Sequence, residues 1–205
     1  FTLVIVLIGT GVRWLLPHLL ALKSSLSLIL IGVVGVAGML LAVVLGVIAS
    51  VRISLGKEAG NRPSFTWWVI NRLAFMVGAN NLASFVLYFI QERFPELQGS
   101  AAAQPSSLLM MVVGIAILLI SIPSGWLTDK FGAKLLLLVS GLMATLGTVI
   151  VIMSRTMPVM FLGGVLIGLA TGAFFSSNWA LGTSIVPKEE AGRWLGISNL
   201  AGAGA

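Results

Sequence analysis

The sequence predicts an all-α, polytopic transmembrane helix bundle. Of its 205 residues, 58% are hydrophobic and only 9% are charged. Soluble domains usually carry about 25% charged residues, so this chain has too little charge to cover a water-exposed surface. The apolar residues form long stretches that lack the alternating pattern of membrane-spanning strands. At about 20 residues per helical span, the length accommodates about six or seven spans.

Six apolar stretches are long enough to be transmembrane helices, and a seventh begins near Trp194. The first stretch contains Arg13, Pro17 and His18. Because proline removes a helical hydrogen bond, we expect a shortened span followed by an interfacial turn there. The six stretches are residues 1–22, 26–50, 65–90, 107–127, 135–154 and 158–185.

The placement of Lys and Arg predicts the orientation, because cytoplasmic loops carry an excess of these residues. Arg72 does not enter this comparison, since it falls inside a predicted span. The connections predicted to be cytoplasmic contain Arg52, Lys57, Arg62, Lys130, Lys134, Lys188 and Arg193. The opposite connections contain only Arg13, Lys23, Arg93 and Arg155.

Two connections are longer than the others. Residues 51–64 form the most polar one, and they include Gly56, Gly60 and Pro63. We expect a cytoplasmic linker here, joining two halves of a larger protein. Residues 91–106 carry charged residues and prolines, which predicts an exposed loop on the outer side.

The composition excludes several classes of function. The net charge is +6, but the basic residues are dispersed, which indicates a membrane protein with a basic inner side rather than a nucleic-acid-binding protein. The chain has no cysteine and a single histidine, His18, and its six acidic residues are scattered. We therefore expect no catalytic residues, no metal site and no cofactor, and we expect that the protein is not an enzyme.

The strongest motif lies between the fourth and fifth predicted spans. Residues 125–134 read GWLTDKFGAK and are termed the signature loop here. This loop resembles that of the major facilitator superfamily, in which Gly, Asp, a basic residue, Gly and a further basic residue recur at this spacing. The matching residues are Gly125, Asp129, Lys130, Gly132 and Lys134. Ala133 stands where the family often has Arg, which weakens the basic cluster.

The signature loop also has a physical interpretation of its own. Two spans reverse within a few residues, so Gly125 and Gly132 are expected to permit close packing and unusual backbone angles. We expect Asp129 to lie at the end of one span, beside the backbone donors that begin the next helix, and to pair with Lys130, Lys134 or a basic residue of a neighbouring helix. The alternative is a tight cytoplasmic turn with incidental charges.

A second stretch supports the resemblance. Residues 178–193 contain a Pro, acidic residues and a Gly-Arg pair before a small-residue helix, which is similar to the family's later cytoplasmic loop. The resemblance implies that the sequence is a piece of a longer carrier, from span five to the start of span eleven of twelve. It then assigns residues 1–50 to the last two spans of the N-terminal half, 51–64 to the cytoplasmic linker, and 65–205 to an incomplete C-terminal half.

The resemblance implies a function as well. It implies a secondary active transporter that moves a small solute across the lipid bilayer by alternating access. Residues 71–89 and 176–187 resemble bacterial sugar–proton symporters, which makes a sugar or related polar compound the expected solute, a proton the expected coupling partner, and a bacterial inner membrane the expected location. One alternative is a non-transporting scaffold or a channel, and a channel pore would show a filter-like loop or a charged ring. The other is a membrane-embedded enzyme, which would need a cluster of ionisable residues at one depth.

The third predicted span carries a polar stripe. Asn81, Ser84, Tyr88 and Gln91 recur at helical spacing, and Asn80 adjoins them. Polar groups within lipid need protein or water as partners. We therefore expect the stripe to line a solute cavity, as the resemblance implies for this span. The alternative is hydrogen bonding between helices that only holds the bundle together.

The sixth predicted span carries a second set of polar residues. Thr171, Phe174 and Asn178 share one face, with Trp179 next to it. An amide and an aromatic ring here are suited to a polar ligand such as a sugar, whereas the alternative is a helix-end Asn with an interfacial Trp. Three glycines at every fourth position predict close helix packing instead of ligand contact. They are Gly164, Gly168 and Gly172.

Overall fold

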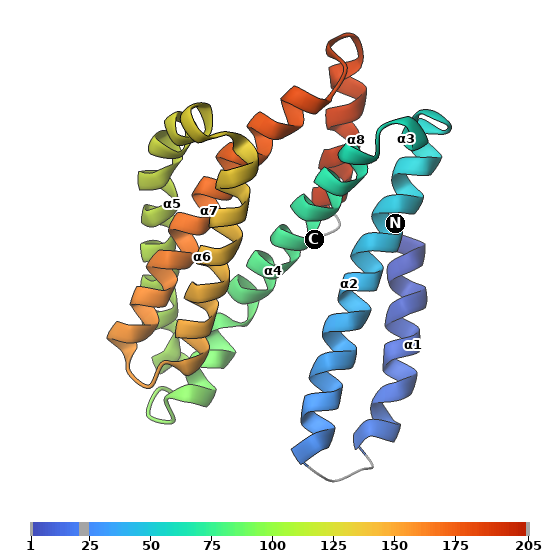
Figure 1. Cartoon of the computed structure of the whole chain (residues 1–205). Coiled ribbons are helices and arrows are strands. Elements are labelled where there is room, and N and C mark those ends of the chain that lie inside the picture. Colours follow the sequence, from blue (N-terminus) through green and yellow to red (C-terminus); the bar gives the residue numbers. More distant parts are fainter. Residues whose placement is uncertain (1, 21–24, 204–205) are drawn as a thin grey trace. The chain divides into compact units, whose positions relative to one another are not determined.

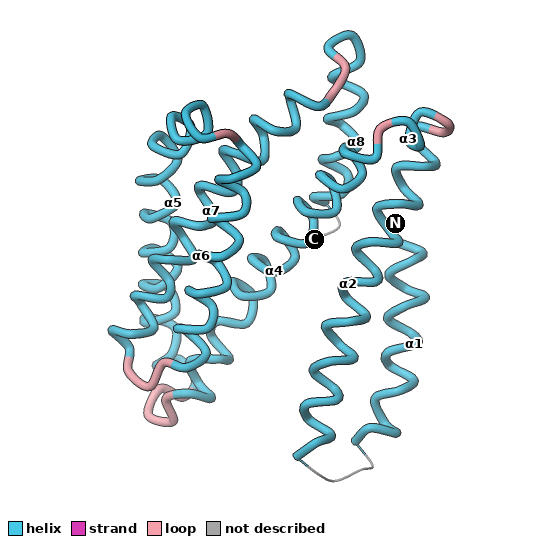
Figure 2. Tube along the Cα trace, in the orientation of Figure 1, coloured by secondary structure: helices cyan, strands magenta, loops and turns pink. Residues whose placement is uncertain are grey.

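The structure, a computed structural model, describes residues 2–20 and 25–203. All regular secondary structure in this part of the chain is helical, and only short turns separate the helices (Figure 2). The prediction of an all-α fold is therefore confirmed.

The chain divides into two compact units, Phe1–Met76 with Val186–Ala205, and Val77–Ile185 (Figure 1). The first unit holds α1 (Thr2–Leu20), α2 (Ser25–Leu55), α3 (Glu58–Asn61), the short 3-10 helix η2 (Lys188–Glu190) and α8 (Ala191–Ala203). The second unit holds the 3-10 helix η1 (Gly99–Ala102), α5 (Ala103–Phe131), α6 (Ala133–Met153) and α7 (Met157–Ile185). Helix α4 (Pro63–Arg93) begins in the first unit and ends in the second.

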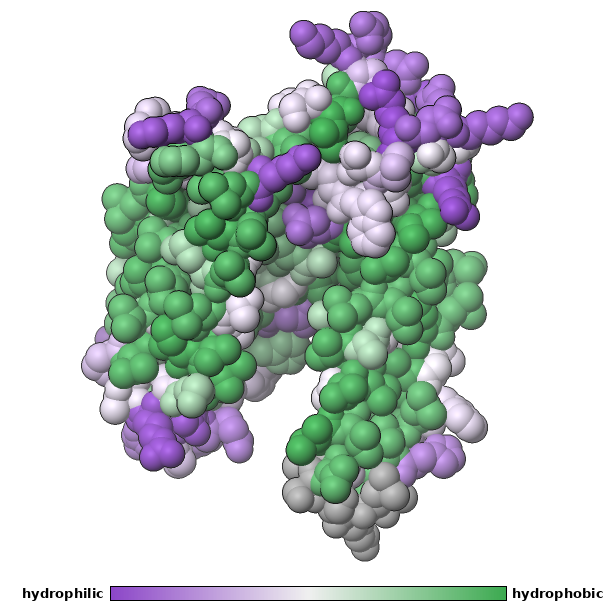
Figure 3. All heavy atoms as spheres, viewed as in Figure 1, coloured by the Kyte–Doolittle hydropathy of each residue, from purple (hydrophilic) through white to green (hydrophobic). Residues whose placement is uncertain are grey.

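Within the described residues, six helical segments are long and apolar enough to cross a membrane, which agrees with the predicted polytopic bundle. In the view of Figure 3, apolar side chains cover the lengths of α5 and α6, and polar side chains gather at their ends. A helix satisfies its own backbone hydrogen bonds, so this arrangement suits a lipid environment. The segments are Thr2–Leu20, Ile29–Leu55, Pro63–Arg93, Gly99–Phe131, Ala133–Met153 and Met157–Ile185.

The prediction of a turn within the first stretch is wrong for the described residues. Helix α1 continues through Arg13 and Pro17 to Leu20. Proline is tolerated within spanning helices because a helix is the arrangement that satisfies the remaining backbone groups in lipid. His18 Nδ1 lies 3.1 Å from the carbonyl oxygen of Trp14. The end of the predicted stretch, residues 21 and 22, lies outside the described residues.

The polar connection at residues 51–64 is mostly helical, and it is shorter than the sequence suggests. Helix α2 continues to Leu55, and Gly56 then adopts a positive φ of 58°. Helix α4 begins at Pro63, and proline suits a first helical position because the N–H that it lacks has no helical acceptor there. The role of this segment as a linker between two halves stays a prediction.

The predicted loop at residues 91–106 is shorter than expected, although most of its residues are exposed as predicted. Most of the segment is helical, and Phe94 and Ala102 are buried in a core cluster with Ile90, Leu109 and Met160. Two glutamine side chains close the turn: Gln91 Nε2 donates to the Gly99 carbonyl, and Gln98 Nε2 donates to the Gln91 carbonyl. Arg93 Nε donates to the Ser154 carbonyl, which fastens the end of α4 to the turn between α6 and α7.

Helix α7 forms the centre of the second unit, since it packs against both α5 and α6. The glycines of α7 permit this close packing. A Cβ added at Gly168 would lie 2.6 Å from the Val113 carbonyl oxygen, and one at Gly164 would lie 2.6 Å from a methyl carbon of Leu109. On another face, a Cβ at Gly163 would lie 2.8 Å from the Gly147 carbonyl oxygen of α6. The predicted close packing at the repeated glycines is confirmed.

Candidate functional site

The polar stripe of α4 lies on an exposed face in the second unit. Asn80, Asn81, Ser84 and Tyr88 are all exposed. Asn81 Nδ2 donates to the Val77 carbonyl at 2.8 Å within the same helix, so its side-chain oxygen keeps acceptor capacity. The ring of Phe85 lies 6.4 Å from that of Tyr88, which places an aromatic surface beside the polar groups.

The opposite face of the same helix segment is packed. Val86, Leu87 and Phe89 contact the core cluster that contains Ile90, Leu109 and Met160. This part of the helix therefore has one packed apolar face and one exposed face, on which the polar groups lie together with Phe85. Hydroxyl, amide and phenol groups on one exposed face can donate and accept hydrogen bonds, which is the chemistry that binds an uncharged polar solute.

The predicted site residues of α7 lie in two different environments. Thr171 and Asn178 are buried, with 7% and 0% of their surfaces exposed, and the Thr171 hydroxyl donates to the Ile167 carbonyl. Trp179 is 37% exposed. The amide and the indole are thus not presented on one exposed face in this structure, and their role as a ligand platform stays a prediction.

The signature loop forms the turn between α5 and α6. Helix α5 ends at Phe131, Gly132 follows with a φ of 87°, and α6 begins at Ala133. The Gly132 N–H donates to the Thr128 carbonyl at 2.9 Å, which closes the end of α5. A positive φ of this size strains any residue with a Cβ, so glycine is needed at this position.

The expected roles of Gly125 and Asp129 need correction. A Cβ at Gly125 would lie 3.9 Å from Ser176 Oγ, an ordinary contact distance, so close packing does not require glycine there. Asp129 lies in the last turn of α5, which is the end of a span as expected. It is exposed, and it forms no hydrogen bond or ion pair with any residue that the structure describes. The helix dipole disfavours an anion at this end.

Lys130 has a different partner from the one predicted. Its Nζ lies 4.9 Å from the centre of the Trp126 ring and 5.3 Å from that of Phe131. Lys134, in the first turn of α6, is exposed. The loop therefore presents a cation held between aromatic rings and a carboxylate without a partner among the described residues.

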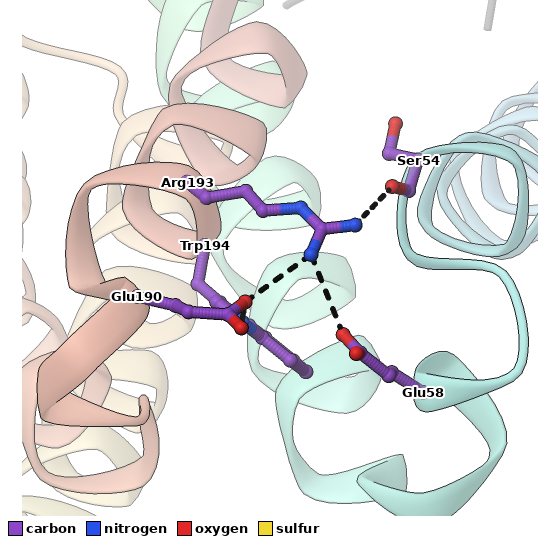
Figure 4. A network of polar contacts seen from close by, with 5 residues as sticks. All are labelled: Ser54, Glu58, Glu190, Arg193 and Trp194. Carbon is purple, nitrogen blue, oxygen red and sulfur yellow. Dashed lines mark hydrogen bonds and ion pairs between the residues drawn. The ribbon is translucent and has the colours of Figure 1, made fainter.

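The first unit contains a polar cluster that the sequence did not predict as one site. Figure 4 shows the Arg193 guanidinium between two carboxylates, with Nη1 3.5 Å from Glu58 and 3.2 Å from Glu190. Its Nη2 donates to the Ser54 carbonyl at 3.1 Å. The Trp194 indole N–H also donates to Glu190 at 3.2 Å. The cluster joins the start of α8 to the end of α2 and to α3.

Spacing along the chain explains why this cluster was missed. Glu58 and Arg193 lie far apart in sequence, and both belong to segments that look only like charged connections. The Gly-Arg pair at the end of residues 178–193 was the one available signal. The exposed ion pairs contribute little energy individually, so the cluster serves mainly to fix which segments meet.

The helical fold and the apolar lengths of its helices define a polytopic membrane protein. The chain belongs to the Major Facilitator Superfamily, whose family model matches residues 70–205. Among characterised proteins, a stretch of 77 residues is 32% identical to the minor myo-inositol transporter IolF of Bacillus subtilis (strain 168). That stretch is 38% of this chain and spans 18% of the length of the relative. No solved structure matches the chain.

Asp129→Asn in the full-length protein is expected to reduce transport strongly while leaving membrane insertion intact. The substitution keeps the size of the side chain but removes a charge that has no partner among the described residues, so any partner must be met during the transport cycle or in another part of the protein. Uptake rates at equal expression measure the effect, with Glu92→Gln as a control for the loss of an exposed charge. Uptake by Asp129→Asn at the wild-type rate would contradict this prediction and would show that the signature loop serves only as a structural turn.

Proposed function

We propose that this chain forms part of a secondary active transporter that moves an uncharged, hydroxyl-bearing solute across a bacterial inner membrane by alternating access. The exposed polar stripe of α4 carries the proposal. A helix apolar enough to span a membrane places Asn80, Asn81, Ser84 and Tyr88 on one face while its opposite face packs against protein. Lipid offers these groups no hydrogen-bond partners, so they need protein or water, and we propose that they line a water-filled solute path.

The comparisons support the choice of solute class. The relative is named as a transporter of myo-inositol, a compound that carries only hydroxyl groups, and the amides and hydroxyls of the stripe suit such a ligand. Myo-inositol and simple sugars are therefore the first solutes to test. A proton gradient is the proposed driving force, and no chemical change of the solute is proposed.

Cysteine labelling tests the cavity. The chain contains no cysteine, so single substitutions can be introduced without background. Cysteines at Asn81, Ser84 and Tyr88 are expected to react with small, charged thiol reagents, and a transported solute is expected to slow the reaction. Two positions serve as controls: Val86, which packs against the core, and Ile122, which is 85% exposed on an apolar face of α5.

The labelling pattern distinguishes the two interpretations of the stripe. A cavity predicts labelling at the three polar positions alone, with protection by solute. A helix-packing role predicts uniformly slow labelling that solute does not change, and this outcome would contradict the proposal. If Asn81 satisfies a solute hydroxyl, Asn81→Ala is expected to weaken apparent affinity by about 1–3 kcal/mol.

A further inference from the structure

Helix α5 presents one continuous apolar face to its surroundings. The exposed side chains recur at helical spacing, whereas the buried residues Leu109 and Ala116 lie on the opposite side, where α7 packs. With Ile122 85% exposed and Leu118 73% exposed, this face has the character of a surface that contacts lipid chains. The exposed apolar residues are Met111, Ile115, Leu118, Leu119, Ile122 and Trp126.

Lys130 continues the line of this face, four residues beyond Trp126 and eight beyond Ile122. Trp126 is 61% exposed and Phe131 is 52% exposed, so both rings that flank the Lys130 ammonium are open to the surroundings. Asp129, the residue just before Lys130 in the chain, forms no ion pair with the ammonium within the described residues. An exposed cation therefore lies at the end of an apolar face, within an aromatic cradle.

We propose that this end of α5 binds an anionic phospholipid. The phosphate lies against the Lys130 ammonium, with Lys134 as a second exposed cation at the start of α6, and an acyl chain lies along Ile122 and Leu118. Tryptophan favours the depth of lipid headgroups because it has an apolar ring and a polar N–H. Each basic residue near a membrane surface adds about 1 kcal/mol of attraction to anionic lipid. The basic residue Lys130 of the signature loop would thus serve lipid binding.

Lipid retention in the full-length protein tests the proposal. The protein is purified with an equimolar mixture of phosphatidylglycerol and phosphatidylcholine, and the retained lipids are counted by native mass spectrometry. Lys130→Gln is expected to lower the preference for phosphatidylglycerol about fivefold. Lys130→Arg, which keeps the charge, is expected to retain most of it. Lys188→Gln is the matched control, because Lys188 is also an exposed basic residue at a helix connection.

The outcomes are separable. A selective loss in Lys130→Gln, together with a smaller loss in Trp126→Leu, supports a lipid site built from the cation and the ring. Equal losses in Lys130→Gln and Lys188→Gln would show only general attraction to charge, and would overturn the proposal. Unchanged retention in all variants would also overturn it, and would leave another protein segment as the occupant of this face. Melting temperatures of the variants establish that each one is folded.

Discussion

Gly168→Leu is expected to prevent α7 from packing against α5 and to abolish the folded second unit. A Cβ at this position would lie 2.6 Å from the Val113 carbonyl oxygen and 2.7 Å from Ala116 Cβ. The first of these atoms belongs to the backbone, which cannot move aside as a flexible side chain does. Overpacking typically costs about 1–3 kcal/mol per site, and a leucine against a neighbouring backbone lies at the upper end of that range or beyond it.

The measurement is the yield and melting temperature of protein solubilised in mild detergent. Gly141→Leu on α6 is the matched control, because no atom lies within 4 Å of a Cβ added there. The same side chain is thereby introduced into the same kind of helix, with and without a close neighbour. Equal yields and melting temperatures for the two variants would contradict the packing seen between α5 and α7.

Much of the fold follows from two simple patterns in the sequence. The apolar stretches match the spanning helices because a bilayer requires a minimum helical length, whatever the tertiary packing. The fourfold spacing of Gly164, Gly168 and Gly172 predicts a close helix contact, because small residues on one face let two backbones approach. Both patterns are local, and each is complete within a single helix.

The corrections concern contacts between distant parts of the chain. The segment at residues 91–106 is predicted as a loop because its charges and prolines are visible locally, whereas the burial of Phe94 and Ala102 depends on contacts with α5, α6 and α7. The sequence does not predict that α1 continues through Pro17. It shows the backbone hydrogen bond that proline removes, but not that a lipid environment favours a continuous helix.

The candidate site likewise has one part that the sequence predicts and one part that depends on how the helices pack. The exposed stripe of α4 follows from helical periodicity alone, so its residues could be predicted as one face. The separation of Asn178 from Trp179 depends on how α7 packs, and adjacent residues on a helix point in different directions. Lys130 was expected to pair with a carboxylate, but its ammonium lies near the exposed rings of Trp126 and Phe131.

Trp194→Ala is expected to destabilise the first unit by about 3–5 kcal/mol, the usual cost of removing a large buried ring. Trp194 is only 2% exposed. Its ring packs edge-on against Phe65 with centroids 4.8 Å apart, and the Arg62 guanidinium lies 5.7 Å from its centre. Its indole N–H donates to Glu190, which also binds Arg193. One side chain therefore joins the apolar core of the unit to its charged cluster.

Two further variants separate the contribution of the indole hydrogen bond from that of the buried ring. Trp194→Phe keeps an aromatic ring but loses the hydrogen bond to Glu190, so a smaller loss of about 0.5–1.5 kcal/mol is expected. Trp67→Ala is the matched control, because Trp67 is 64% exposed on α4 and its removal leaves no cavity. Thermal unfolding in detergent is expected to rank the variants with Trp194→Ala least stable, then Trp194→Phe, then Trp67→Ala near the wild type. If Trp67→Ala were as unstable as Trp194→Ala, the core of the first unit would not be centred on Trp194.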